Sequence, residues 1–237
     1  MGATHRTAKD FATFRLSSRG EAYEGDRRKV FAAYEDAKRL GVRLEVVCGR
    51  SEYEGEHRKK LFSEIPRIEG ELVVLDRVVD SDADALRDLK DNPNVQRWLP
   101  TYLFENRRDD VHETIRLLYG DLYENKESLI LAVRLKATGE LVGLAEFYGL
   151  RDDLHKISVG GRLREQHWSC GIGTEMVTLM VGYLYGETDI EIITASVMVD
   201  NVASASTLEK CDFIRTARSV EEDWGYPELT IVDKFFC

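Results

Sequence analysis

The sequence is poor in cysteine and has no long apolar run. Its four cysteines, Cys48, Cys170, Cys211 and Cys237, are scattered, and no two of them form a CxxC pair. This spacing predicts neither a disulfide framework nor a zinc site, and because no His, Cys and Asp cluster has ligand spacing we expect no metal. No apolar run approaches the roughly 18 residues of a membrane helix. The first residues, MGATHRTAKDFATF, lack the apolar segment of a signal peptide, so we expect a cytoplasmic protein without a membrane contact.

Basic residues are outnumbered over most of the chain. The 237 residues include 33 Lys and Arg against 43 Asp and Glu, which gives a net charge of −10. Residues 1–69 hold 15 basic and 12 acidic residues and so carry +3, which leaves −13 for residues 70–237. That acidic part should repel nucleic acid and attract cationic partners, although net charge also serves solubility alone. We expect no nucleic-acid partner.

Proline is scarce too, and one of the four prolines marks the predicted domain boundary. In EIPRIEGE, residues 64–71, a proline and a glycine separate two patterned regions. We therefore predict an extension over residues 1–66 and a main domain over residues 67–237. The extension has strand patterns at 11–16 and 42–47 and helix patterns at 26–41 and 54–65, which predict a small β-α-β-α unit. Its role stays open.

The main domain mixes strand and helix patterns, and short turns join several neighbouring strands. Helices are predicted over residues 80–92, with an Asp or Ser N-cap, and over 107–125, 171–187 and 201–211. Strands are predicted over 71–78, 127–135, 141–150, 155–163, 190–199, 213–220 and 228–236. This order favours an α/β (α+β) fold with a mixed, mostly antiparallel central sheet and helices on both faces.

Two glycines stand where a helix is predicted to begin. Gly171 and Gly173 follow a strand and a short loop, although each glycine weakens a helix by about 1 kcal/mol relative to alanine. Unpaired N–H groups at a helix N-terminus bind anions, and glycine lets a phosphate approach the backbone closely. The GxGxxG pattern fails because Met176 stands at its third glycine, and no P-loop is present. The glycines alone therefore leave open a softened helix start without a ligand.

Three segments carry a family resemblance. GGRLREQHWSCGIGTE (160–175), DNVASASTLEKCDF (200–213) and NPNVQRWLP (92–100) resemble, in the correct order, the motifs of GNAT-superfamily N-acetyltransferases of the ribosomal-protein branch. The resemblance covers roughly residues 68–237. It departs from the family pattern at Ser169, Cys170 and Asp212, which replace a common glycine, a common Lys or Arg, and another glycine.

The resemblance implies an N-acetyltransferase that moves an acetyl group from acetyl-CoA to a primary amine by direct attack on the thioester. The acceptor would be a protein N-terminus, a polyamine or another small amine. The alternative is a catalytically inactive CoA-binding sensor or scaffold. A homodimer stays open. By resemblance, the residues in contact with acetyl-CoA are Val159, Gly161, Leu163, Arg164, Trp168, Ser169, Cys170, Gly171, Ile172, Gly173, Thr174 and Asn201.

The resemblance implies a specific thiolate donor but does not single out one residue as the base. The tyrosine that many relatives use to protonate the thiolate is Leu208 here, and the ribosomal branch has a serine at the position of Ser204. A glutamate common on the strand before the glycine loop is Ser158 here. The base is therefore sought among Glu146, Glu221 and Glu222, each of which is otherwise a plain surface carboxylate, with His155 and His167 as alternatives that are otherwise structural or exposed. For the acceptor side the candidates are the aromatic residues Trp98, Tyr102, Phe104 and Tyr148, which are alternatively simple core. Asn201 is alternatively an N-cap.

Overall fold

The chain forms two compact units, residues Met1–Arg58 and Lys59–Cys237. The computed structural model describes residues 13–18, 21–25, 45–49, 58–98 and 110–237. In the first unit, β1 (Thr13–Ser18) pairs antiparallel with both β2 (Glu21–Gly25) and β3 (Glu45–Gly49). The strand β2 was not predicted, because EAYEG is poor in β-branched residues and takes its extended form by pairing with β1. The helix predicted over 26–41 lies outside the described residues.

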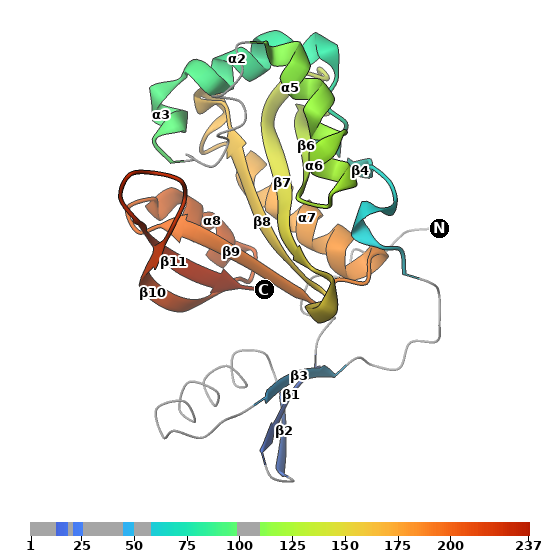
Figure 1. The fold of residues 1–237 in the computed structure, drawn as a ribbon, viewed down its shortest axis with the longest axis vertical. Coiled ribbons are helices and arrows are strands. Elements are labelled where there is room, and N and C mark those ends of the chain that lie inside the picture. Colours follow the sequence, from blue (N-terminus) through green and yellow to red (C-terminus); the bar gives the residue numbers. More distant parts are fainter. Residues whose placement is uncertain (1–12, 19–20, 26–44, 50–57, 99–109) are drawn as a thin grey trace. The chain divides into compact units, whose positions relative to one another are not determined.

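The second unit is built on one eight-stranded sheet, in the order β10-β11-β9-β8-β7-β6-β5-β4 (Figure 1). All neighbouring strands in it are antiparallel except β8 and β9, which are parallel. The mixed, mostly antiparallel sheet that the sequence predicts is therefore confirmed. The strands are β4 (Ile68–Glu69), β5 (Val73–Asp76), β6 (Ser128–Leu135), β7 (Leu141–Arg151), β8 (Lys156–Leu163), β9 (Ile192–Met198), β10 (Ile214–Glu222) and β11 (Thr230–Phe236).

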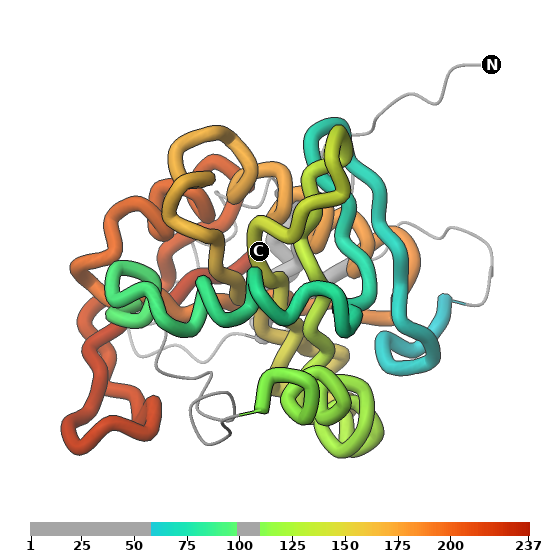
Figure 2. Tube along the Cα trace, turned by 90° about the horizontal axis from the view of Figure 1, so that it is seen from above, coloured from blue at the N-terminus to red at the C-terminus, as the bar shows by residue number. Residues whose placement is uncertain are grey.

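Helices cover both faces of the sheet, as predicted. They are α2 (Ala83–Asp91), α3 (Pro93–Gln96), α5 (Val111–Leu118), α6 (Asp121–Glu124), α7 (Ile172–Glu187) and α8 (Val202–Lys210). Along β6, Leu129 and Leu131 pack into a core with α7 and α8, whereas Ile130 packs with α2 and α5 on the opposite face. Figure 2 shows α7 and the α5–α6 segment on opposite sides of the sheet. The two-sided burial explains the unbroken apolar run of β6. In the described ranges, no helix is long and apolar enough to cross a membrane.

Two predicted helices differ from the structure. The helix predicted over 107–125 is two helices where it is described, because α5 ends at Leu118 and Gly120 is the N-cap of α6. The helix predicted over 54–65 is wrong where described. Lys59 instead pairs in parallel with Thr188 just beyond α7, and only a 3-10 turn, η2 (Leu61–Ser63), follows. Hydrogen bonds to a distant segment replace those that a local helix would have made.

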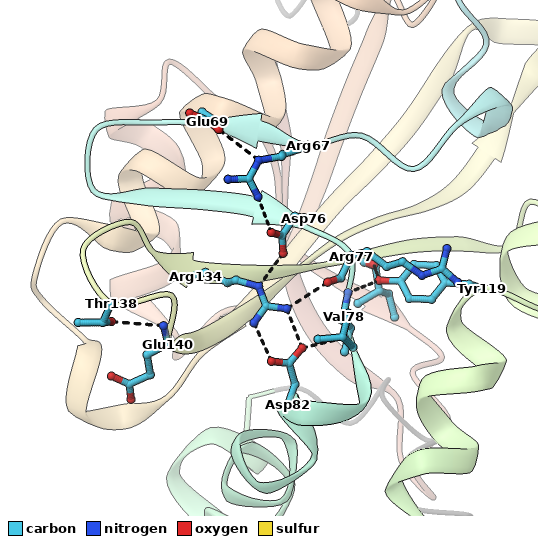
Figure 3. A network of polar contacts seen from close by, with 12 residues as sticks. Arg67, Glu69, Asp76, Arg77, Val78, Asp82, Tyr119, Arg134, Thr138 and Glu140 are labelled. Atoms are coloured by element: carbon cyan, nitrogen blue, oxygen red, sulfur yellow. Dashed lines mark hydrogen bonds and ion pairs between the residues drawn. The ribbon is translucent and has the colours of Figure 1, made fainter.

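A buried ion-pair network joins β5 and β6 to the start of α2 (Figure 3). The Arg134 guanidinium donates to Asp76 at 2.7 Å and to both oxygens of Asp82 at 2.6 and 2.7 Å. Asp82 also accepts the Val79 N–H at 2.8 Å and is only 6% exposed. In the structure Asp82 is the N-cap residue of α2, but its carboxylate makes no cap hydrogen bond to that helix. It serves the network instead.

Candidate active site

The two central strands, β8 and β9, are paired over only three residues. Their parallel pairing joins residues 156–158 to residues 192–194. Within the described ranges no pairing continues beyond this point, where β8 follows β7 and β9 follows β11, and the strands diverge (Figure 1). We call this divergence the fork. The Ser158 and Thr194 hydroxyl oxygens lie 2.9 Å apart at the last pair, so Ser158 closes the narrow end of the fork.

The edge of β8 that faces the fork presents main-chain groups to it. The Arg164 N–H donates to a β7 carbonyl at 2.8 Å, so the even-numbered residues of this strand turn their main-chain groups toward β7. Peptide groups alternate along a strand, and those of Val159, Gly161 and Leu163 therefore point into the fork. The Leu163 carbonyl is already used, because Trp168 Nε1 donates to it at 2.8 Å. Val159 and Gly161 are thus best placed to pair with an extended ligand.

The loop between β8 and α7 explains the first glycine of the helix start. Ser169 and Gly171 both have positive φ, 60° and 83°, and α7 begins directly after Gly171. A Cβ on Gly171 would meet nothing within 4 Å, so glycine is needed there for the backbone conformation and not for lack of space. A Cβ on Gly173 would make ordinary contacts only, the nearest at 3.6 Å. The space beside Gly171 is therefore open to a ligand that approaches the helix N–H groups.

The two helices that follow β8 and β9, which are α7 and α8, both begin at the open end of the fork. Because β8 and β9 run parallel, α7 and α8 each start where their strand ends, and each directs a positive helix end there. Asn201 is the N-cap of α8, and its Oδ1 accepts the Ser204 N–H at 3.1 Å. The first turn of α7 packs against the end of α8, where Cys211 Sγ donates to the Thr174 carbonyl at 3.4 Å. Ser204 is half-buried, and no described group hydrogen-bonds its hydroxyl.

Charged side chains anchor the glycine loop to the neighbouring elements. Arg164, which we expected to contact the cofactor, directs its guanidinium to Asp88 of α2 at 2.6 Å and to Glu140 at 2.7 Å. This guanidinium is therefore engaged by carboxylates, and its geometry supports an anchoring role. Glu165 accepts two side-chain amides from the start of α3, each at 2.9 Å, and the hydrogen bond from Asn92 is the main cause that lowers its pKa.

Glu146 lies on β7 beside the fork. It is the cross-strand partner of Gly160, and the Ser128 hydroxyl donates to its Oε1 at 2.6 Å. Tyr148 projects on the same face of the sheet as Glu146 and is the partner of Ser158. Burial, and then the Glu146 carboxylate, raise the pKa of Tyr148 above its usual range. We call this side of the sheet, which also carries the side chain of Thr194, the fork face.

Glu221 and Glu222 point to opposite sides of β10. The Glu222 carboxylate is ion-paired with Lys234 and accepts Trp224 Nε1 at 3.0 Å. Lys234 also donates to Ser196 at 3.1 Å, and Ser196 lies on the fork face of β9. Glu222 therefore shares the fork face with Glu146. Glu221 is exposed and projects from the opposite side of the strand.

The aromatic residues expected on the acceptor side are only partly described. Trp98 is half-buried, and the Arg97 guanidinium lies 4.3 Å from the centroid of its ring. Tyr148 lies on the fork face, and a Cβ on Gly160 would be 3.4 Å from its ring. Tyr102 and Phe104 lie outside the described residues. Their role as acceptor contacts stays a prediction.

The structure adds polar residues to the fork face that the sequence analysis missed. Ser128 holds Glu146, and Thr194, Ser196 and Lys234 line the β9–β11 side of the fork. A signal existed in β9, where Thr194 and Ser196 alternate with buried apolar residues. No signal in β11 distinguishes Lys234 from a surface lysine. In the part of the chain that is described, no group of three or more His, Cys, Asp or Glu is placed to hold a metal ion.

Comparisons with known proteins agree with this arrangement. Residues 73–214 match the family model described as an acetyltransferase (GNAT) domain. The uncharacterized N-acetyltransferase YoaA of Bacillus subtilis (strain 168) is 27% identical over 150 residues, which are 62% of this chain and 82% of that protein.

Solved structures share the fold. One is RimL, a ribosomal L7/L12 alpha-N-protein acetyltransferase in complex with coenzyme A, which is 17% identical with a TM-score of 0.62 over 73% of this chain and 97% of that one. Another is the spermidine N-acetyltransferase of Vibrio cholerae in complex with CoA and spermine, also 17% identical, with a TM-score of 0.58 over 71% and 96% of the two chains. At such identities the likeness shows the fold alone. The family model, in contrast, covers more than half of the sequence, and the chain therefore belongs to the GNAT acetyltransferase family.

Proposed function

We propose that this protein is an acetyl-CoA-dependent N-acetyltransferase whose acceptor is a cationic primary amine, either a protein N-terminus or a polyamine. The observation that carries the proposal is the fork, which combines an open strand edge, the start of two helices and a face with two carboxylates. RimL is described as a protein N-acetyltransferase and the Vibrio cholerae enzyme as a spermidine N-acetyltransferase, and both were solved with CoA. These relatives support both acceptor classes.

The residues of the fork fit acetyl-CoA. The N–H groups of residues 170–174 at the start of α7 would bind the pyrophosphate, because they lack helical partners and Gly171 leaves the approach open. The main-chain groups of Val159 and Gly161 would pair with the pantetheine arm. Packing also requires glycine at position 161, since a Cβ there would lie 2.7 Å from Met176 Cε and 2.9 Å from the Leu144 carbonyl.

The chemical step needs a neutral amine, because an ammonium has no lone pair to attack the thioester. We assign the proton acceptor to Glu146, acting directly or through water. Its carboxylate is held by Ser128, and its neighbour across β8 is Gly160, which places no side chain beside it. Glu222 is the second candidate on the fork face, where its carboxylate is ion-paired with Lys234 and accepts Trp224 Nε1. Glu221 is on the wrong side of its strand.

Ser204 is assigned to the departing thiolate. It is the third residue of α8, where the helix dipole favours negative charge, and its hydroxyl has no described partner to displace. A hydroxyl donor at this place stabilises charge that develops on sulfur as the carbon–sulfur bond breaks. The acceptor is expected to be cationic because residues 70–237 carry −13, and two of their carboxylates, Glu146 and Glu222, lie on the fork face.

The test is the release of free thiol from acetyl-CoA with a panel of amines, namely spermidine, spermine, and peptides with free or blocked N-termini. We expect release with at least one cationic amine. In the responsive reaction, Glu146→Gln should lower kcat at neutral pH by about 100-fold or more, with recovery at alkaline pH where the amine loses its proton unaided. Glu221→Gln is the matched control. It makes the same change at a glutamate of β10 that points away from the fork face, and it should retain full activity.

Three results would overturn parts of this assignment. CoA binding without thiol release from any amine would make the protein a sensor or scaffold. Full activity of Glu146→Gln at neutral pH, with loss in Glu222→Gln, would move the base to Glu222. Full activity of both variants would mean that the proton leaves through water alone.

A further inference from the structure

The segment that enters the second unit lies along the whole length of α7. At the C-terminal end of the helix, the Lys59 N–H donates to the Glu187 carbonyl and the Lys59 carbonyl accepts the Asp189 N–H, both at 3.2 Å. Leu61 then inserts into the core with an exposure of 2%. At the other end of the helix, residues 70–72 reach its first turn. We call residues 59–72 the strap.

Glu175 joins the strap to the first turn of α7. Its carboxylate accepts the N–H of Glu71, and it accepts the N–H of Leu72 at 2.9 Å on one oxygen and 3.0 Å on the other. A Cβ on Gly70 would overlap the carboxylate oxygen, so glycine there leaves room for the contact. The strap is held from the other side as well, because Lys136 Nζ donates to the Gly70 carbonyl at 2.9 Å.

The charge of Glu175 has two opposite effects at this position. A carboxylate one turn into a helix is favourable for the helix itself, yet it repels an anion that binds at the same helix end. Here two main-chain N–H groups donate to the carboxylate and hold it away from the loop at Gly171. A charge-assisted hydrogen bond is also stronger than a neutral one. The geometry therefore favours a clamp over a free negative charge beside the site.

We propose that Glu175 is a positioning residue for acetyl-CoA: by clamping the strap to the first turn of α7, it fixes the N–H groups that bind the pyrophosphate. This inference rests on the proposed function, because it takes the start of α7 to be the acetyl-CoA site. It adds residues 59–72 to the structure that supports cofactor binding. Glu175 does not touch the reacting atoms, so its effect should fall on cofactor affinity and not on the chemical step.

The first test compares two glutamates of the same helix that both contact the strap. Glu175→Ala should raise both Kd for CoA, measured by calorimetry, and KM for acetyl-CoA by about 10-fold, with kcat within about twofold. Glu175→Gln keeps one carbonyl oxygen for the two N–H groups and should fall between. Glu187→Ala is the control. It removes an exposed carboxylate that lies 3.7 Å from Lys59 at the far end of α7, and it should leave Kd unchanged.

The second test uses the overlap at Gly70. Gly70→Ala should displace the carboxylate and weaken CoA binding as Glu175→Ala does. Once Glu175 is alanine, the same methyl meets no carboxylate, so the double variant should bind CoA no more weakly than either single one. Hydrogen exchange of the Glu71 and Leu72 amides measures the hydrogen bonds to Glu175 without any cofactor. Glu175→Ala should make the exchange of both amides faster.

The outcomes separate this inference from the proposed function. If the wild-type chain binds no CoA, the proposed function fails, and this inference fails with it. If wild type binds CoA and Glu175→Ala binds it equally well, the inference alone fails. Tighter binding by Glu175→Ala and Glu175→Gln would show that the carboxylate acts as a repelling charge. An equal loss in Glu187→Ala would show a general effect on the helix, which would also overturn the inference.

Discussion

Replacing Arg134 by methionine should destabilise the second unit by about 3 to 5 kcal/mol, the usual cost of removing one partner from a buried ion pair. The Arg134 side chain is 15% exposed and Asp82 is 6% exposed, so these contacts are largely shielded from water. Without Arg134, the only described donor left to the Asp82 carboxylate is the Val79 N–H. The carboxylate of Asp76 keeps a basic partner, because Arg67 still lies 2.8 Å from it.

Thermal unfolding followed by circular dichroism measures this effect. A unit of this size shifts in Tm by about 2 to 4 °C per kcal/mol, so Arg134→Met should lower Tm by about 6 to 20 °C. The hydrogen bonds to Asp82, and then those to Asp76, raise the pKa of Arg134 above its usual range. The guanidinium is therefore charged throughout the working pH range, and its own deprotonation would remove its contribution only far into the alkaline region.

The matched control is Arg67→Met, which removes another arginine that contacts the same Asp76. Arg67 is 58% exposed, so its loss should change stability by no more than about 1 kcal/mol. A second substitution, Asp82→Asn, should recover part of the loss in the Arg134→Met background, because it removes the unpaired charge. The reasoning is refuted if Arg134→Met lowers Tm no more than Arg67→Met does.

Three further predictions concern the loop, the donor and the strap. Gly171→Ala should lower Tm by about 2 to 4 °C, because its φ of 83° costs a side chain about 1 kcal/mol or more, whereas Gly173→Ala should be neutral; thermal unfolding of both variants checks this, and equal Tm values would contradict it. Ser204→Ala should lower kcat by about 10-fold to 100-fold with an unchanged Kd for acetyl-CoA, and full activity in the thiol assay would remove its assigned role. A chain that begins at residue 67 should be less stable than one that begins at Lys59 by about 2 to 5 kcal/mol, because it lacks the buried Leu61; equal denaturant midpoints would argue against this.

Much of the fold was predictable from the sequence because its signals are local. The apolar run over residues 129–133 and the glycine loop before α7 mark their elements through neighbours only a few residues away. The order of strands and helices then sufficed to predict a mixed, mostly antiparallel sheet. The motif residues of the glycine loop and of α8 indicated the GNAT family, which the family model confirms.

The tertiary structure decided what depends on distant partners. Glu221 and Glu222 are adjacent residues of the same type, and only the pairing of β10 with β11 shows which one shares the fork face with Glu146. Pairing also explains the failed helix at 54–65, because the partner of Lys59 is Thr188. Sequence patterns do not contain such contacts, since a strand's neighbours come from anywhere in the chain.

Arg164 and Glu175 show the same limit for single side chains. An arginine beside a predicted phosphate loop resembles an anion ligand in sequence, yet Asp88, 76 residues away in the chain, accepts its guanidinium. The sequence identifies Glu175 only as a residue that matches the family motif. Its hydrogen-bond partner, the N–H of Glu71, is 104 residues away in the chain. Residue type determines what chemistry a side chain can do, but the fold determines which partner uses it, because hydrogen bonds and ion pairs act only over a few ångströms.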